Sequence, residues 1–404
     1  MSERELSDWL SSYVRFTQNS EPPTSYHTWA GLSLIAGALQ RKVFLRWGFE
    51  EIYPNLYVVL VGPAGRCRKG VALGIAKNLL VNVPGVSVAP ESSSGREALV
   101  QVMKRAAKDL VDAETGQVSM HCSLTAFSEE LSVFLGQSDV KYLANLTDWY
   151  DSKAHWEYET IGRGKDSLEG LCFNLLGATA PDWIQSMLPQ EAIGGGFTSR
   201  IIFIVEEQKG KTVPKHQLTP TELALGDSLQ RDLERISQLK GPFEFTPSGE
   251  TSYCDWYAEQ DRRIARGDMP VADRRFAAYC ERRATHVRKM MMLCSASRGD
   301  SLEISHEDFD RAISMLERAE LKMGMTFGGL GKARNSDITE QVMRYIQAVG
   351  VTTRSAVMSR FYRDIDQDGL RNIEATLEQM HFIEITLIPK SNDKKYVLCS
   401  NEGY

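Results

Sequence analysis

The sequence predicts an α/β fold built on a parallel sheet with helices on both faces. Short apolar runs at 56–61, 119–127, 171–177 and 201–205 are typical of strands that are buried on both faces. Segments in which apolar residues recur at helical spacing separate these runs. Buried strands that alternate with helices form parallel sheets, because each parallel connection needs a crossover that is usually a helix.

The first run leads into a glycine-rich turn that predicts a phosphate-binding loop. Beyond this turn the apolar residues recur at helical spacing. In a strand, loop and helix of this kind, main-chain N–H groups cup an anion, a lysine neutralises it and the helix dipole adds to the attraction. We expect the following residues to bind the phosphates of a nucleotide: Gly62, Pro63, Ala64, Gly65, Arg66, Cys67, Arg68, Lys69, Gly70 and Val71.

The loop departs from the usual spacing G-x-x-x-x-G-K-[ST]. Lys69 stands one position later than the usual lysine, and Arg68 occupies the usual lysine position. Gly70 follows Lys69, so the hydroxyl that normally binds magnesium is missing. The alternative interpretation is a tight turn between a strand and a helix, with basic residues that face solvent.

Paired acids follow the second apolar run, at Glu129 and Glu130. At the end of a buried strand, one carboxylate can hold the magnesium shell while the next orients the attacking water. We assign Glu129 to the metal and Glu130 to the general base. The alternative is an acidic helix start, because glutamate favours the first turn of a helix.

Two further candidate catalytic side chains lie beside the other runs. Thr179 lies just beyond the third run and, with Asn174 within the run, is placed to contact a terminal phosphate. Arg200 follows three consecutive glycines and precedes the fourth run, which suits an arginine that reaches the nucleotide of a neighbouring subunit. Arg200 can equally form a structural ion pair.

Alternating residues at 155–170 predict a β-hairpin with a basic tip. Arg163 and Lys165 lie at this tip, where they can contact a nucleic-acid backbone, or where they simply face solvent in a turn. Farther upstream, Ser94 and Glu97 have the spacing of a capping box, which predicts a helix that continues to about Leu110.

The patterns divide the chain into four parts. Residues 1–50 predict a helical amino-terminal collar, 51–240 the nucleotide-binding core and 241–328 a helical lid. Residues 335–404 predict three helices and a β-hairpin, the arrangement of a winged helix-turn-helix domain. The third helix of this last part carries more acids than bases, so both DNA contact and protein contact remain open for it.

Composition narrows the classes of protein. With 404 residues, 42% apolar residues and a net charge of −6, the chain is typical of a soluble globular protein, and nucleic-acid contact must come from local basic patches. No apolar run is long enough to span a membrane, so no membrane partner is expected. Seven scattered cysteines without a C-x-x-C pair predict reduced thiols and a cytoplasmic location.

Together these motifs resemble a family of bacteriophage and prophage proteins that are related to replicative helicases and often occur with primase domains. The similarity spans about residues 20–325. The stretches that carry it are 53–65, the Arg68-Lys69-Gly70 loop, 127–131, 177–181 and 196–200. The predicted lid and terminal domain also resemble those of ring helicases of the minichromosome-maintenance type.

The resemblance implies a P-loop NTPase fold of the AAA+ or RecA-like kind, with ATP and Mg²⁺ as cofactors. It implies a homo-oligomeric ring, a hexamer, that moves along single-stranded DNA as a helicase during replication of a phage or mobile element. A primase or a polymerase is the further partner that it implies.

Two other functions remain open. The first is an ATP-binding replication initiator or helicase loader that hydrolyses ATP poorly, which the missing hydroxyl after Lys69 keeps open. The second is a DNA-binding regulator with a vestigial nucleotide fold. Glu129, Glu130 and Arg200 favour hydrolysis, and the regulator would need a basic recognition helix that the sequence lacks.

Overall fold

A computed structural model describes residues 4–398, apart from 92, 94, 112–115, 137–139, 161–163, 182, 185–187, 189–191, 193, 216, 328–335, 363–364, 381, 390 and 392. The chain divides into two compact units, residues 1–327 and residues 328–404.

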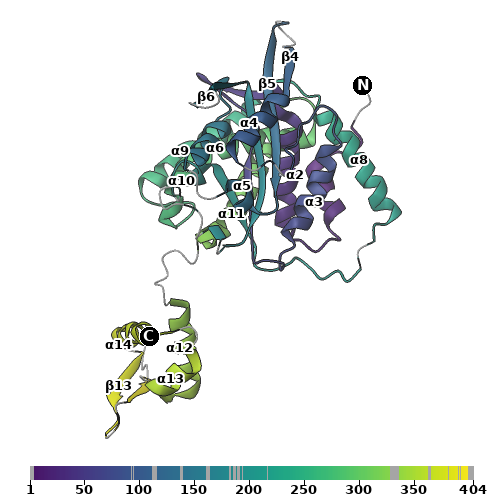
Figure 1. Cartoon of the computed structure of the whole chain (residues 1–404). Coiled ribbons are helices and arrows are strands. Elements are labelled where there is room, and N and C mark those ends of the chain that lie inside the picture. Colours follow the sequence, from purple (N-terminus) through teal and green to yellow (C-terminus); the bar gives the residue numbers. More distant parts are fainter. Residues whose placement is uncertain are drawn as a thin grey trace. The chain divides into compact units, whose positions relative to one another are not determined.

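A five-stranded sheet forms the centre of the first unit (Figure 1). Its strands lie in the order β4 (Ala107–Val111), β5 (Val118–Ser128), β8 (Leu171–Thr179), β3 (Tyr57–Val61) and β9 (Ile201–Val205). β3 pairs in parallel with β8 and β9, β5 pairs in parallel with β8, and β4 is antiparallel to β5. All four expected strands are therefore confirmed, and their carboxyl ends lie at one edge of the sheet.

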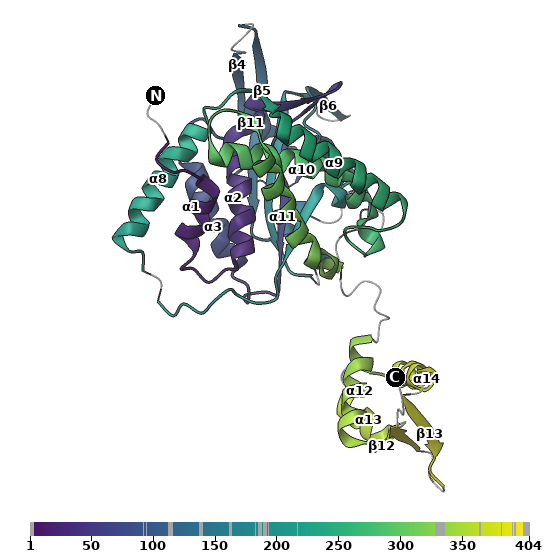
Figure 2. The same ribbon diagram turned by 180° about the vertical axis from the view of Figure 1, so that it is seen from behind.

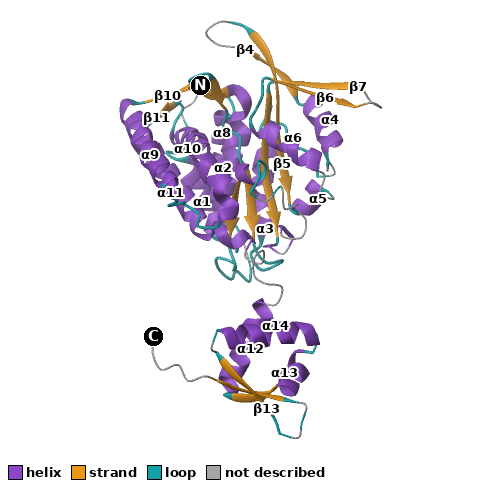
Figure 3. Ribbon diagram, turned by 90° about the vertical axis from the view of Figure 1, so that its left-hand side faces the viewer, coloured by secondary structure: helices purple, strands orange, loops and turns teal. Residues whose placement is uncertain are grey.

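Helices cover both faces of this sheet (Figure 3). On one face lie α2 (Thr24–Leu39) and α3 (Lys69–Val81). Gly37 lets α2 lie close to β5 and α3, because a Cβ there would lie 2.7 Å from the Thr125 hydroxyl and 2.8 Å from Leu80. On the other face lie α5 (Leu131–Leu135) and α6 (Val140–Tyr150), and Tyr57 of β3 donates its hydroxyl hydrogen to the Leu146 carbonyl.

A second, smaller sheet joins the two ends of the first unit. It contains β11 (Glu303–Ile304), β10 (Gly241–Phe245), β1 (Val43–Trp47) and β2 (Glu50–Ile52) in this order. β1 comes from the expected collar and pairs in parallel with β10 from the expected lid. Collar, core and lid residues therefore pack as one compact unit.

The remaining helices of this unit come from its two ends. α1 (Trp9–Thr17) packs on α2 and α8 (Pro220–Ile236), while α10 (Ala277–Arg298) and α11 (His306–Met323) pack together with α9 (Pro247–Ala265), as Figure 2 shows. Short 3-10 turns occur at Gln40–Lys42, Thr198–Arg200, Arg274–Phe276 and Gly324–Phe327. Among the described residues, no helix has the length and apolar character that crossing a membrane requires.

Two β-hairpins lie on the amino side of the sheet. β6 (His155–Thr160) and β7 (Gly164–Glu169) form the expected hairpin. β4 and the first half of β5 form a second hairpin, which extends beyond the body of the unit in Figure 1. The helix expected to continue to Leu110 is wrong there: α4 (Arg96–Arg105) ends at Arg105 with Gly95 as its N-cap, because residues 107–111 pair with β5 instead. Ser94 lies outside the described residues.

The second unit contains three helices and a three-stranded antiparallel sheet. The helices are α12 (Ser336–Val349), α13 (Arg354–Phe361) and α14 (Gln367–Gln379), and the sheet order is β12 (Val351–Thr353), β14 (Lys394–Leu398) and β13 (Ile383–Leu387). Buried Glu374 of α14 accepts hydrogen bonds from Tyr396 and Lys394 and pairs with Arg354. One acid of the third helix is therefore internal rather than part of a recognition surface.

Two buried asparagines hold the amino end of β3. The side-chain oxygen of Asn174 accepts from the Leu56 N–H at 2.9 Å, and its amide nitrogen donates to the Ser33 carbonyl at 3.0 Å. Asn55 donates to the Tyr150 and Phe173 carbonyls at 2.9 and 3.0 Å. These amides satisfy main-chain groups that regular sheet pairing leaves open.

We expect Asn174→Ala to lower the free energy of unfolding by about 2 kcal/mol, because the buried Leu56 N–H would lose its acceptor. Chemical denaturation of the full chain measures this. The matched control is Asn82→Ala at an exposed position of the α3 end, which should change stability by less than about 0.5 kcal/mol. Equal effects in the two variants would show that Asn174 does not have this structural role.

Candidate functional site

Residues from three strand ends gather at the carboxyl edge of the central sheet. They surround a cavity of about 640 Å³. Residues 62–71, which we name the glycine loop, follow β3, while the paired acids follow β5 and Thr179 ends β8. The cavity is lined by Ala64, Gly65, Arg68, Lys69, Gly70, Val71, Glu129, Glu130, Ser132, Thr179, Ala180 and Trp183. Parallel strands place their carboxyl ends together, which explains how segments distant in sequence meet here.

Close packing fixes the start of the glycine loop. A Cβ on Gly62 would lie 2.5 Å from the Glu206 carbonyl oxygen and 2.7 Å from the Tyr26 hydroxyl, so only glycine fits. Tyr26 donates its hydroxyl hydrogen to the Val61 carbonyl at 2.7 Å, and the Gly62 N–H donates to the Thr179 carbonyl at 3.2 Å. The loop therefore leaves the sheet at a defined position beside the end of β8.

Lys69 is the first residue of α3 and reaches back across the glycine loop. Its ammonium donates to the Gly62 carbonyl at 2.5 Å and to the Pro63 carbonyl at 3.2 Å. Partial burial lowers the pKa of Lys69 below its ordinary value. The ammonium thus lies across the loop that is expected to hold phosphates.

The other polar side chains of the glycine loop have different roles. Arg68 has a left-handed backbone conformation with φ of 54°, and its Nε lies 2.7 Å from a carboxylate oxygen of Glu21. Cys67 is buried and its thiol contacts the Glu206 carbonyl at 3.2 Å, which anchors the loop. Arg66 is exposed and does not line the cavity. Lys69 is therefore better placed than Arg68 to neutralise a bound anion.

The two acids face the same cavity with their carboxylates exposed. Among the described residues neither Glu129 nor Glu130 makes a side-chain hydrogen bond or ion pair. A Cβ on Gly70 would lie 3.4 Å from Glu129 Oε2, so this carboxylate lies against the amino end of α3. Glu130 is the N-cap of α5, but its side chain makes no capping bond. Both carboxylates therefore keep their oxygens available to a ligand.

The structure separates the two polar residues of β8. Thr179 is buried at the strand end and lines the cavity, with its hydroxyl 3.2 Å from the Ala180 carbonyl. Asn174 lies five positions earlier and binds Leu56 and Ser33, so its proposed contact with a phosphate is wrong. The physical reason is that the middle of a buried strand packs against the helical layer rather than opening at the sheet edge.

Arg200 lies at the opposite, amino edge of the sheet, just before β9. The side chain is 8% exposed and binds Asp151 through two hydrogen bonds, of 3.1 and 2.5 Å. It also donates to the Gly196 carbonyl at 2.8 Å. Of the two roles left open by the sequence, the described geometry corresponds to the structural ion pair.

The basic tip of the β6–β7 hairpin is only partly described. Lys165 is exposed and pairs with Glu157 of the neighbouring strand at 2.6 Å. Arg163 lies outside the described residues. An exposed ion pair of this kind contributes little to stability, so Lys165 can exchange Glu157 for a phosphate.

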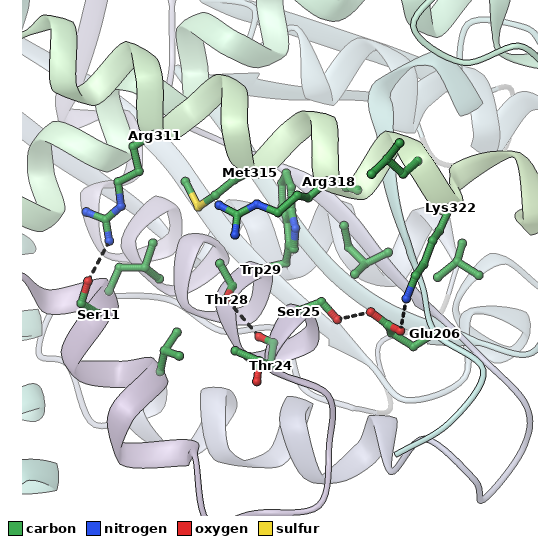
Figure 4. A pocket seen from close by; sticks show the side chains of 16 residues that line it. Ser11, Thr24, Ser25, Thr28, Trp29, Glu206, Arg311, Met315, Arg318 and Lys322 are labelled. Atoms are coloured by element: carbon green, nitrogen blue, oxygen red, sulfur yellow. Dashed lines mark hydrogen bonds and ion pairs between the residues drawn. The ribbon is translucent and has the colours of Figure 1, made fainter. Parts of the chain in front are cut away.

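A second cavity of about 680 Å³ lies beyond β9, between α1, α2 and α11 (Figure 4). Its lining includes Trp29 and Met315. Glu206 at its edge accepts hydrogen bonds from Ser25 at 2.7 Å and from Lys322 at 2.6 Å. The Glu206 main chain also contacts the glycine loop. The sequence did not indicate Glu206 or Tyr26 as supports of the loop, because neither belongs to a local motif.

Comparisons with protein-family models and with curated proteins find no match for this chain. Among the described residues there is no group of three or more histidine, cysteine, aspartate or glutamate side chains that could hold a metal ion by itself.

We expect Arg200→Ala to lower the free energy of unfolding by about 2 kcal/mol, because it removes the buried partner of Asp151, which is only 37% exposed. Urea denaturation measures the change. Arg262→Ala is the matched control, since Arg262 pairs with Glu259 at 3.0 Å on the surface and should matter by less than about 0.5 kcal/mol. Unchanged stability in Arg200→Ala would contradict a structural role.

Proposed function

We propose that this protein is an ATP hydrolase with a P-loop NTPase fold of the AAA+ or RecA-like kind, which drives movement along single-stranded DNA as a helicase in phage or mobile-element replication. The observation that carries this proposal is the gathering of the glycine loop, Lys69, two unpaired carboxylates and Thr179 around one cavity. Ligands of open parallel sheets bind at this edge, outside the carboxyl ends of the strands.

The strand order supports a nucleoside triphosphate as the ligand. β8 lies between β3, which carries the glycine loop, and β5, which carries the acids. Neighbouring strands are about 4.8 Å apart, so the loop and the acids start from positions about 10 Å apart. This separation leaves room for a terminal phosphate and a water between Lys69 and Glu130.

The residues present fit ATP with Mg²⁺. The tight packing at Gly62 and the amino end of α3 form a cradle for the phosphates, and Lys69 neutralises their charge. Glu129 would hold Mg²⁺, which commonly binds through one or two carboxylates together with substrate phosphates and water. When bound, Mg²⁺ supplies neutralisation of the charge that develops on the transferred phosphoryl group.

The chain's own residues have distinct roles in this proposal. Glu130 accepts a proton from the attacking water, because its carboxylate is unpaired in the described structure and faces the cavity. Thr179 offers a hydroxyl at the end of β8, close to the loop start that it also binds through its carbonyl. Lys69 holds the phosphates in position, which lowers the entropic part of the barrier.

The DNA partner and the assembly state also belong to the proposal. We propose a homo-oligomeric ring, a hexamer, as the assembly that moves along the DNA strand, in the cytosol of a bacterial host. A primase or polymerase is the further partner that we propose. Lys165 and Arg163 on the β6–β7 hairpin would face the DNA, and the second unit would act as a winged helix. Because Arg200 is buried against Asp151, the ring proposal does not depend on Arg200 acting on a neighbour.

One observation favours a second candidate, an ATP-binding initiator or helicase loader that hydrolyses slowly. Gly70 stands where a hydroxyl ligand of magnesium usually occurs, and Glu129 lies directly against it. A site with fewer metal ligands can bind ATP and still turn it over slowly. Binding and turnover therefore need separate measurements.

Lys69→Ala should abolish binding of a fluorescent ATP analogue, because the glycine loop would lose the ammonium group that neutralises the phosphates. Equilibrium titration of the full chain measures this. Lys240→Ala, at an exposed position before β10, is the control and should bind like the wild type. Tight binding by Lys69→Ala would show that the glycine loop does not hold the phosphates through this side chain.

Glu130→Gln should keep binding of the ATP analogue and lose turnover by at least about 100-fold, because an amide cannot accept the proton from water. Phosphate release at saturating ATP measures this, and Glu207→Gln at an exposed position is the control. If both variants hydrolyse ATP at the wild-type rate, Glu130 is not the base. If the wild type binds the analogue without turnover, the loader is the better assignment.

A further inference from the structure

One aromatic side chain is fully exposed in a tight turn near the amino edge of the central sheet. Phe49 lies in the two-residue loop between β1 and β2, where Trp47 pairs with Glu50. Gly48 has φ of 61°, which is the feature of a type II′ hairpin turn and leaves the next side chain pointing outward. A single exposed apolar residue is common in proteins, so Phe49 carries meaning only through what surrounds it.

Phe49 borders a cavity of about 650 Å³ that contains several cations. Arg41, Lys153, Arg282 and Lys289 all line it. Residues 150–154, which lie just before the β6–β7 hairpin, form one wall. Asp151 in this wall binds Arg200 at the amino end of β9, so the cavity lies at the sheet edge opposite the glycine loop. It is therefore separate from the proposed nucleotide site.

Among the described residues, three of these four cations, Arg41, Arg282 and Lys289, have no carboxylate at hydrogen-bond distance. Lys289 is 3% exposed, and its ammonium donates to the Tyr53 carbonyl at 2.8 Å and the Asn55 side-chain oxygen at 2.6 Å. Arg282 is 30% exposed and lies 3.6 Å from Asp151, whose oxygens already accept from Arg200. Burial without an acidic partner lowers the pKa of Lys289 to about 7, so a bound anion would stabilise its charged form.

The remaining charged groups of the cavity leave an excess of positive charge. Arg41 lies over the Tyr53 ring at 3.8 Å and donates to main-chain carbonyls, and exposed Lys153 pairs with Asp148 at 2.7 Å. The acids that line the cavity are Glu50, Glu51 and Asp151. The lining cations therefore exceed the lining acids by one, and Asp151 is also shared with Arg200, which lies outside the lining.

We propose that this cavity and Phe49 bind single-stranded DNA, with a base stacked on Phe49 and the adjacent phosphate held by Arg282 and Lys153. An exposed aromatic face beside a cationic groove is the combination that binds single strands, because each base offers a π-face and each phosphate a charge. A duplex hides its base faces, and a free phosphate would not need Phe49. The choice of DNA over RNA rests on the proposed function.

The position of this cavity beside the β6–β7 hairpin supports a continuous contact with single-stranded DNA. Lys153 lies two residues before β6, and Lys165 lies on β7 of the same hairpin. Nucleotides bound at Phe49 could therefore continue along the β6–β7 hairpin. Lys153 and Lys165 are held only by exposed ion pairs, of 2.7 and 2.6 Å, which exchange readily for phosphates.

The stacking contact is tested by fluorescence anisotropy of the full chain with a labelled 20-nucleotide oligothymidine, in the absence of ATP. Phe49→Ala should weaken binding by about tenfold, and Phe49→Trp should retain the wild-type affinity, because base stacking needs only an aromatic face. Tyr257→Ala, at an exposed position of α9, is the aromatic control and should not change the affinity. Equal affinity of the wild type and Phe49→Ala overturns the proposal.

The phosphate contacts are tested by the salt dependence of the same binding reaction. Arg282→Gln and Lys153→Gln should each reduce the slope of log K against log salt by about 0.7, the value expected for one phosphate on a single strand. Arg266→Gln, at the exposed end of α9, should leave the slope unchanged. Unchanged slopes in the first two variants, equal affinity for a duplex, or tighter binding to RNA of the same sequence would each overturn the assignment.

Titration of the ATP analogue separates this inference from the proposed function. Phe49→Ala should bind the analogue like the wild type, because the two sites lie at opposite sheet edges. A wild type that binds DNA through Phe49 but no ATP supports the DNA site and defeats the ATPase proposal. If the wild type binds ATP, and Phe49→Ala binds DNA as tightly as the wild type does, the ATPase proposal is supported and this DNA site is defeated.

Discussion

The parallel pairing of β3 with β8 is the interaction on which the rest of the structure depends. This register sets Val61 opposite Thr179, and the Gly62 N–H continues it by donating to the Thr179 carbonyl. The glycine loop consequently begins beside the strand end that lines the cavity. Because β5 joins the other side of β8, the acids reach the same edge without any local sequence link to the loop.

At the amino edge of the sheet, buried polar side chains hold the starts of the strands. Asn55 and Asn174 satisfy main-chain groups around the amino end of β3, and Lys289 joins this network through Asn55. Arg200 and Asp151 anchor the start of β9 nearby. This network holds the strand starts in place, and Asp151 is shared between Arg200 and the partly exposed Arg282.

Much of the central fold and of the carboxyl-edge site could be predicted from the sequence. β3, β8 and β9 are buried along their whole length, so their apolar runs are visible without a partner strand. The glycine loop, Glu129 and Thr179 could be placed together because parallel strand ends share an edge. These predictions needed only local patterns and one rule of sheet geometry.

The predictions that failed depended on strand pairing and tertiary contacts that local sequence patterns do not show. Residues 107–111 look like the end of a helix until β5, the next strand along the chain, pairs with them. Asn174 looked like a site residue because the sequence does not show that it binds Ser33 of α2. The Asp151 partner of Arg200 was hidden for the same reason, since tertiary contacts decide the role of an isolated polar residue.

The most direct test of the central claim is phosphate release by the intact wild-type chain, measured with ATP and Mg²⁺ in the presence and absence of single-stranded DNA. The proposed site predicts hydrolysis that stops when EDTA removes Mg²⁺ and that accelerates when single-stranded DNA is added. Absence of both nucleotide binding and phosphate release under these conditions would contradict the assignment of the carboxyl-edge cavity to ATP.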